Sequence, residues 1–139
     1  MASLRTRLAR RLGRAHRGMT LLEIMIVLAI LALVMGLLVG PKVMKMFAES
    51  KVDTTKIKVK KYAFEAFPSW SASHPDKACP EKIGDLNEYM NGDDSNDAWG
   101  KPIKLLCGAN LPPGAKGIAV MSSGPDQKEG SEDDIKSWE

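Results

Sequence analysis

The stretch that decides the fold is "RGMTLLEIMIVLAILALVMGLLVGP", residues 17–41, a long apolar run that contains a single acid, Glu23. As a helix with a rise of about 1.5 Å per residue, twenty such residues extend about 30 Å, roughly the hydrocarbon thickness of a bilayer. We therefore expect residues 19–41 to form a transmembrane helix.

Residues 1–18 form a basic leader that contains six arginines and no acid. A Sec-type signal peptide is cut after its apolar segment, whereas the small residue at this junction, Gly18, lies before the apolar run. A cut between Gly18 and Met19 would remove the arginines and keep the helix. A mitochondrial presequence, which is also rich in arginine and poor in acids, is the alternative, but it does not account for Glu23.

Glu23 lies four residues after Met19, inside the apolar run. An ionised side chain at the centre of a membrane helix costs on the order of 2.5–3.5 kcal/mol, so such an acid usually has a partner. A cut after Gly18 would create an amino group on Met19 one helical turn away. The partner of Glu23 is then either this amine or the amine of a neighbouring copy. The alternative is a carboxylate that extends to the lipid headgroups.

Residues 42–72 carry apolar residues at positions that are mostly compatible with an amphipathic continuation of the helix. A proline preceded by two glycines predicts a kink or local unwinding before this segment. The residues concerned are Gly36, Gly40 and Pro41. Four lysines spread around the helix, which favours a solvated or assembly-facing surface over one stripe for DNA or phospholipid. They are Lys56, Lys58, Lys60 and Lys61.

Without the leader, the chain carries a small net negative charge. Beyond residue 18 the chain has 14 lysines against 17 acids, a net charge of −3. The basic balance of the whole chain therefore comes from the leader, and we expect no nucleic-acid partner.

Residues 73–139 are expected to form a small globular head of the α+β class. "CPEKIGDLNEYMN", residues 79–91, predicts a short helix. "KPIKLLC", residues 101–107, and "GIAVMSSG", residues 117–124, predict short strands of an antiparallel sheet, bounded by proline and glycine.

Cys79 and Cys107 are the only two cysteines. In a domain exported across the membrane, an even number of cysteines favours a disulfide. Two free buried thiols are the alternative. A metal site that includes His74 is a third possibility, although the ligand spacing matches no known pattern.

The C-terminal segment gathers five acids within nine residues, opposed only by Lys128 in sequence. They are Asp126, Glu129, Glu132, Asp133 and Asp134. Such a loop is either solvated or wraps a hard cation, because carboxylate and carbonyl oxygens suit Ca²⁺. The spacing is not that of an EF-hand, and composition leaves both possibilities open.

The N-terminal stretch resembles the signal of type IV pilins and of type II secretion pseudopilins: a basic leader ending in glycine, then a TLxE core in an apolar helix. This resemblance implies cleavage after Gly18 by a prepilin peptidase and N-methylation of Met19. It also implies a pilin-like α+β fold and a filament in which Glu23 contacts the N-terminus of the next subunit. The leader is longer than is usual in pseudopilins, and Met19 replaces the commoner phenylalanine.

Two further segments resemble the major pseudopilins of type II secretion systems. "SSGPDQKEGSEDDIKSW", residues 122–138, is similar to their SLGPDG…DDIGNW ending, and "DAWGKPI", residues 97–103, is similar to their DPWGxPY segment. The resemblance implies a Ca²⁺ site in the C-terminal loop. Its ligands would be the side chains of Asp126 and Asp133 and the backbone carbonyls of Ser123, Lys128 and Ser131.

The function that this resemblance implies is structural. The chain is expected to be a non-enzymatic subunit of a periplasmic pseudopilus, a homopolymer anchored in the bacterial inner membrane and working with minor pseudopilins and an assembly platform. The sequence offers no nucleophile, acid/base pair or phosphate loop that favours catalysis. The alternatives are a type IV pilin of a surface fibre and a membrane-anchored, calcium-dependent binding module.

Overall fold

The computed structural model describes residues 18–139. The basic leader, apart from Gly18, lies outside these residues. The chain divides into two units between Pro41 and Lys42. The first of these units is helical from Leu21 onward, and the second contains the globular head.

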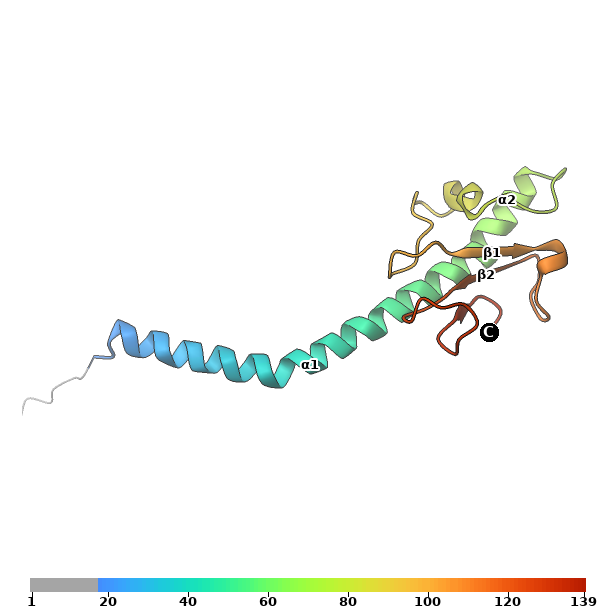
Figure 1. Cartoon of the computed structure of the whole chain (residues 1–139). Helices are drawn as coiled ribbons and strands as arrows, with labels where there is room; N and C mark the ends of the chain where they lie inside the picture. The colour runs from blue at the N-terminus through green and yellow to red at the C-terminus, as the bar shows by residue number, and fades with distance from the viewer. Residues whose placement is uncertain (1–17) are drawn as a thin grey trace, which may run out of the picture. The chain divides into compact units, whose positions relative to one another are not determined.

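The long helix α1 extends from Leu21 to Lys61 (Figure 1). Thr20, the residue before the helix, caps its N-terminus: its Oγ1 accepts a hydrogen bond of 3.2 Å from the Glu23 backbone N–H. The helix continues through Pro41 without interruption, so of the predicted kink or local unwinding, the unwinding is absent here. An exposed helix can lose the one backbone hydrogen bond that proline lacks and still continue when the residues around it remain helical.

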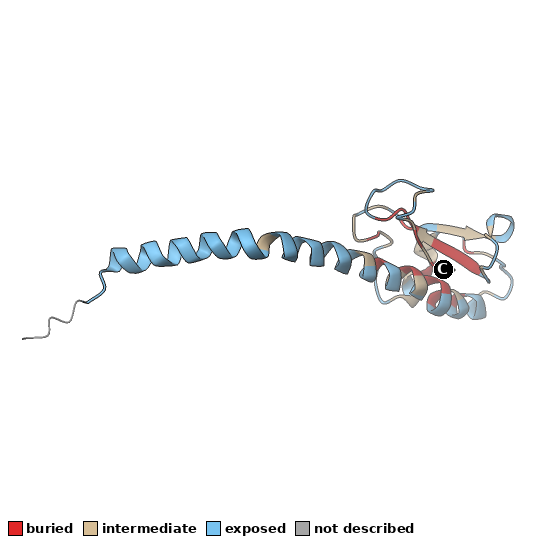
Figure 2. Ribbon diagram, turned by 90° about the horizontal axis from the view of Figure 1, so that it is seen from below, coloured by how far each residue is buried: buried red, intermediate tan, exposed pale blue. Residues whose placement is uncertain are grey.

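The apolar side chains in the first turns of α1 are uncovered within residues 18–139. Every residue from Leu21 to Val39 is exposed (Figure 2). By length and composition, this is the one helix of residues 18–139 that is suited to span a membrane. A helix that is apolar all round and has no covering residues in the described part of the chain is suited to be surrounded by lipid or by other subunits.

In the second unit, α1 passes into a π-helical turn, η1, at Tyr62–Ala66 and then into helix α2 at Phe67–Ser73. One face of this continuous helical segment is buried, with residues spaced three or four apart. The buried residues are Thr55, Val59, Tyr62, Ala63, Ala66 and Trp70. Between Thr55 and Trp70 the segment is therefore amphipathic.

The sheet has three antiparallel strands in the order β1–β2–β3. Strand β1 extends over Lys104–Cys107, β2 over Ile118–Ser122 and β3 over Ile135–Lys136. The central strand β2 packs the sheet against the helical segment, with its residues Ile118 and Val120 in the hydrophobic core (Figure 2). The predicted α+β fold, a long helix on a small antiparallel sheet, is confirmed.

Two short 3₁₀ helices complete the head: η2 at Ile83–Tyr89, at the position of the predicted short helix, and η3 at Gly108–Asn110. Leu86 of η2 is fully buried in the hydrophobic core. A disulfide joins Cys79, before η2, to Cys107 at the end of β1, across a separation of 28 residues. In the chain-entropy model, a crosslink of this span contributes about 3–4 kcal/mol to stability.

Candidate functional site

The N-terminal residues of the candidate processing and assembly site lie at the start of α1. Gly18, Met19 and Glu23 are all exposed, and the Met19 side chain is 70% exposed. Within residues 18–139, the carboxylate of Glu23 makes no hydrogen bond or ion pair. Among the residues that the structure describes, this acid of the apolar helix has no partner, so its carboxylate is free to pair with a group outside them.

The acidic loop, residues 123–134, connects β2 to β3 and returns close to its own start. Ser122 pairs with Ile135 in the sheet register. At Gly124, with φ of +66°, a Cβ atom would lie 2.0 Å from the carbonyl oxygen of Asp133. Only glycine fits a contact this close, since backbone would collide with the added carbon. The two ends of the loop are thus in direct contact.

Hydrogen bonds within the loop fold it further. The Lys128 N–H donates to Asp126 Oδ1 at 3.0 Å, and this bond is the main cause of the lowered pKa of Asp126. The Ser131 hydroxyl donates to the Lys128 carbonyl at 3.1 Å. The Gly130 N–H donates to Asp134 Oδ2 at 2.8 Å. The loop therefore has a defined backbone path.

Two lysines outside the loop hold it from the side of β1. Lys101 Nζ donates to the Gln127 carbonyl at 2.5 Å, and Lys104 Nζ lies 2.8 Å from Glu129 Oε2. The hydrogen bond from Lys104 lowers the pKa of Glu129. Sequence reasoning missed this arrangement, because it set only Lys128 against the acids. The available signal was the pair of lysines on either side of Pro102 and Ile103.

The five predicted calcium ligands all lie on this loop, but they do not form a cluster of acidic side chains. Asp126 and Asp133 are exposed, whereas Ser123 is buried. Within residues 18–139, no three His, Cys, Asp or Glu side chains are gathered so that they could hold a metal ion. A cation here would therefore depend on main-chain carbonyls in addition to carboxylates.

Asp134 is a residue that sequence reasoning did not place among the ligands. Its Oδ1 atom is buried and has no hydrogen-bond partner in the described part of the chain, although Oδ2 accepts from Gly130. A buried carboxylate oxygen without a partner is costly, so it favours an additional positive or donor group nearby. The sequence signal was the second aspartate of the "EDD" run.

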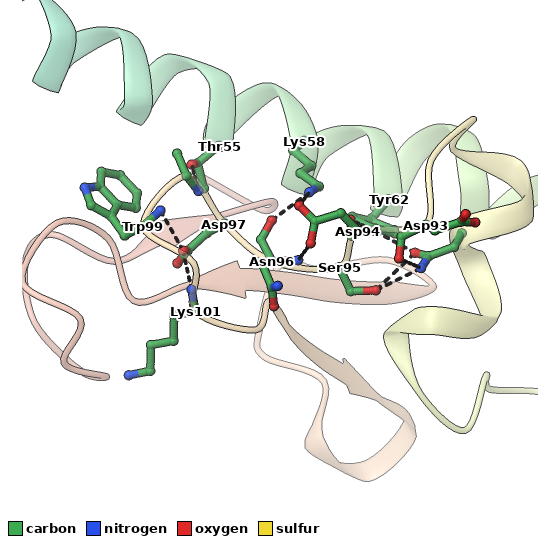
Figure 3. Close-up of polar contacts among 12 residues, drawn as sticks. Thr55, Lys58, Tyr62, Asp93, Asp94, Ser95, Asn96, Asp97, Trp99 and Lys101 are labelled. Atoms are coloured by element: carbon green, nitrogen blue, oxygen red, sulfur yellow. Dashed lines mark hydrogen bonds and ion pairs between the residues drawn. The ribbon is translucent and has the colours of Figure 1, made fainter.

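A polar network fastens the segment before β1 to α1 (Figure 3). Tyr62 donates its hydroxyl to Asn87 Oδ1 at 2.7 Å, and burial raises the pKa of this tyrosine. Lys58 Nζ donates to the Asn96 carbonyl at 2.6 Å and lies 3.4 Å from Asp94 Oδ2. Lys58 thus faces the head, and for this residue the prediction of a solvated or assembly-facing side chain is wrong.

Asp97, the first residue of the "DAWGKPI" segment, is a buried carboxylate with three donors. Its Oδ1 accepts from the N–H groups of Trp99 and Lys101, at 3.0 and 2.9 Å (Figure 3). Its Oδ2 accepts from the Ser122 hydroxyl at 2.6 Å. The structure therefore brings this segment and the start of the acidic loop together, although 25 residues separate Asp97 from Ser122.

Residues 13–39 match the family described as the prokaryotic N-terminal methylation motif. This motif, together with the fold, indicates a type IV pilin-like protein and implies processing by a prepilin peptidase and pilus-type assembly. Comparisons with curated proteins and with solved structures give no significant match.

Proposed function

We propose that this chain is a structural, non-enzymatic subunit of a periplasmic pseudopilus in type II protein secretion. The observation that carries the proposal is the methylation motif over residues 13–39 at the start of an apolar helix, ahead of an α+β head. The similarity of residues 97–103 and 122–138 to major pseudopilins favours a pseudopilus over a surface pilus.

In this role the N-terminal helix anchors the subunit in the bacterial inner membrane, with the head in the periplasm. A prepilin peptidase cuts after Gly18, and the new amino group of Met19 is methylated. The subunits then form a homopolymer on an inner-membrane assembly platform, together with minor pseudopilins, and growth of the filament drives folded substrates through the outer membrane.

The exposed apolar surface of α1 and the carboxylate of Glu23 support assembly by the N-terminal helix. In a bundle of such helices, an ion pair between Glu23 and the methylated amine of a neighbouring Met19 would offset the cost of burying both charges. Because each carboxylate matches one amine, the pair also selects the axial register of adjacent subunits.

We further propose that Ca²⁺ is a structural cofactor of the acidic loop. The available donors are hard oxygen atoms: the side chains of Asp126 and Asp133 and the carbonyls of Ser123, Lys128 and Ser131, which suit Ca²⁺. The buried Oδ1 of Asp134, which has no hydrogen-bond partner among residues 18–139, supports a cation near the loop exit. When bound, the ion would replace repulsion between like-charged carboxylates with coordination.

The experiment that tests the pseudopilus is deletion of the gene in its host, with complementation by the wild-type chain. Loss of secretion, with folded substrates retained in the periplasm, is the expected result. Loss of surface fibres with secretion intact would overturn the proposal in favour of the type IV pilin, which shares the N-terminal motif.

A further inference from the structure

Asp97 lies outside the candidate calcium loop, yet its carboxylate has more contacts than any acid within that loop. The residue is only 6% exposed. Removing a carboxylate from water is costly unless donors surround it. The backbone N–H groups of Trp99 and Lys101 and the hydroxyl of Ser122 supply these donors, so the buried charge is satisfied.

One oxygen of Asp97 determines how the chain enters the loop. The Ser122 hydroxyl donates to Oδ2 of Asp97, and the same Ser122 oxygen accepts the N–H of Gly124 at 3.2 Å. Gly124 in turn lies against the Asp133 carbonyl. A chain of contacts therefore runs from Asp97 to both ends of the loop, and it passes the backbone of Ser123.

The other oxygen of Asp97 determines where Lys101 lies. Its bonds to Trp99 and Lys101 close a turn, which is also held by the Asp97 N–H to the Lys101 carbonyl at 2.8 Å. From this turn the Lys101 ammonium reaches the Gln127 carbonyl at the tip of the loop. The turn thus contacts the loop at a second point.

We propose that the turn at residues 97–101, with Asp97 as its positioning residue, pre-organises the acidic loop before any cation is bound. Because the loop is already ordered, the free energy of cation binding is not reduced by the cost of ordering it, as in other preformed sites. The effect on calcium affinity rests on the proposed function, but the effect on loop order does not.

Limited trypsin digestion of the full chain in detergent micelles with chelator tests the loop order. Lys128 is exposed in the loop, and Lys116 is exposed in the β1–β2 connection. The rate of cleavage after Lys128 divided by the rate after Lys116 therefore reports local opening of the loop. Asp97→Asn and Ser122→Ala should each raise this ratio about tenfold, because each breaks a buried bond to a charged group.

Lys101→Ala should also raise the ratio, and it removes no efficient trypsin site because Pro102 follows. Asp94→Asn is the matched control. Asp94 contacts Lys58 and Asn96 but not the loop, so its variant should leave the ratio unchanged. If Asp97→Asn does not fold, the cleavage ratio of Ser122→Ala decides whether the proposal holds. An unchanged ratio in Ser122→Ala and Lys101→Ala, or a parallel rise at Lys116 and Lys128, overturns the proposal.

Calorimetric titration with Ca²⁺ separates this proposal from the proposed cofactor. If the wild-type chain binds Ca²⁺, Asp97→Asn should weaken the affinity and Asp94→Asn should not. If the wild-type chain does not bind Ca²⁺, the cofactor is wrong, while the cleavage ratio still decides whether the turn orders the loop.

Discussion

Among the glycines of residues 18–139, Gly124 has the closest neighbouring atom. An alanine there would place a Cβ atom 2.0 Å from the Asp133 carbonyl and would keep a φ of +66°. Backbone strain and overpacking together should lower the free energy of unfolding by about 2–5 kcal/mol. Gly130→Ala is the control, because its φ is also positive but nothing lies within 4 Å, so only about 1–2 kcal/mol is expected. Equal losses of unfolding free energy in denaturant titrations would contradict this account.

Glu23 carries the second prediction at this scale. Glu23→Ala should still be cut and inserted, because it leaves Gly18 and the apolar run intact, but it should not assemble efficiently without the carboxylate. The measurement is the yield of filaments sheared from cells that overproduce the protein. Glu49→Ala, which removes another exposed acid of α1, should assemble normally. A wild-type yield from Glu23→Ala would contradict the ion pair between subunits.

At the scale of elements, the disulfide ties the segment before η2 to the end of β1. Cys107→Ser should lower the free energy of unfolding by about 3–4 kcal/mol, since the unfolded chain regains the freedom of a 28-residue loop. Thermal denaturation followed by circular dichroism measures this loss. Reductant should destabilise the wild-type protein to a similar extent and have no effect on Cys107→Ser. A variant as stable as the oxidised wild type would exclude a structural role for the bond.

The attachment of residues 93–96 to α1 should depend on pH. A hydrogen bond from the Asn96 N–H, with a further contribution from Lys58, lowers the pKa of Asp94. A carboxylate whose pKa is lowered by folding stabilises the protein above the unfolded pKa, and this contribution is lost as the pH falls through the folded pKa. The stability difference between wild type and Asp94→Asn should therefore shrink below about pH 4. A constant difference down to about pH 2 would contradict the assignment.

At the scale of the whole molecule, calcium should stabilise the head. A ligand that binds only the folded state adds about 2.7 kcal/mol at a hundredfold excess over Kd. Chelator should lower the melting temperature, Ca²⁺ should restore it, and Mg²⁺ should do so poorly because it demands stricter octahedral geometry. Asp126→Ala and Asp133→Ala should abolish the response, whereas Glu132→Ala, an exposed acid of the same loop, should keep it. Absence of binding up to millimolar Ca²⁺ would reject the cofactor.

The sequence was informative where structure depends on local pattern and failed where it depends on distant contacts. The apolar run, the short helix and the strands β1 and β2 were predictable because length and bounding prolines and glycines mark them. Strand β3 has two residues and is defined only by its pairing with β2. The bonds of Asp97 to Ser122 and of Lys101 to Gln127 join residues about 25 apart, and nothing in the spacing indicates them.

The uncovered surface of α1 between Leu21 and Val39 has a consequence for calorimetry. Since the side chains of this segment pack against nothing in the part of the chain that the structure describes, the segment has little heat to absorb when the head melts. The transition enthalpy should therefore correspond to the second unit alone, roughly 60–80 kcal/mol for about a hundred residues near 60 °C. In the proposed filament, neighbouring subunits would cover the same helix, and the heat of separating them should add an endotherm that the single subunit lacks.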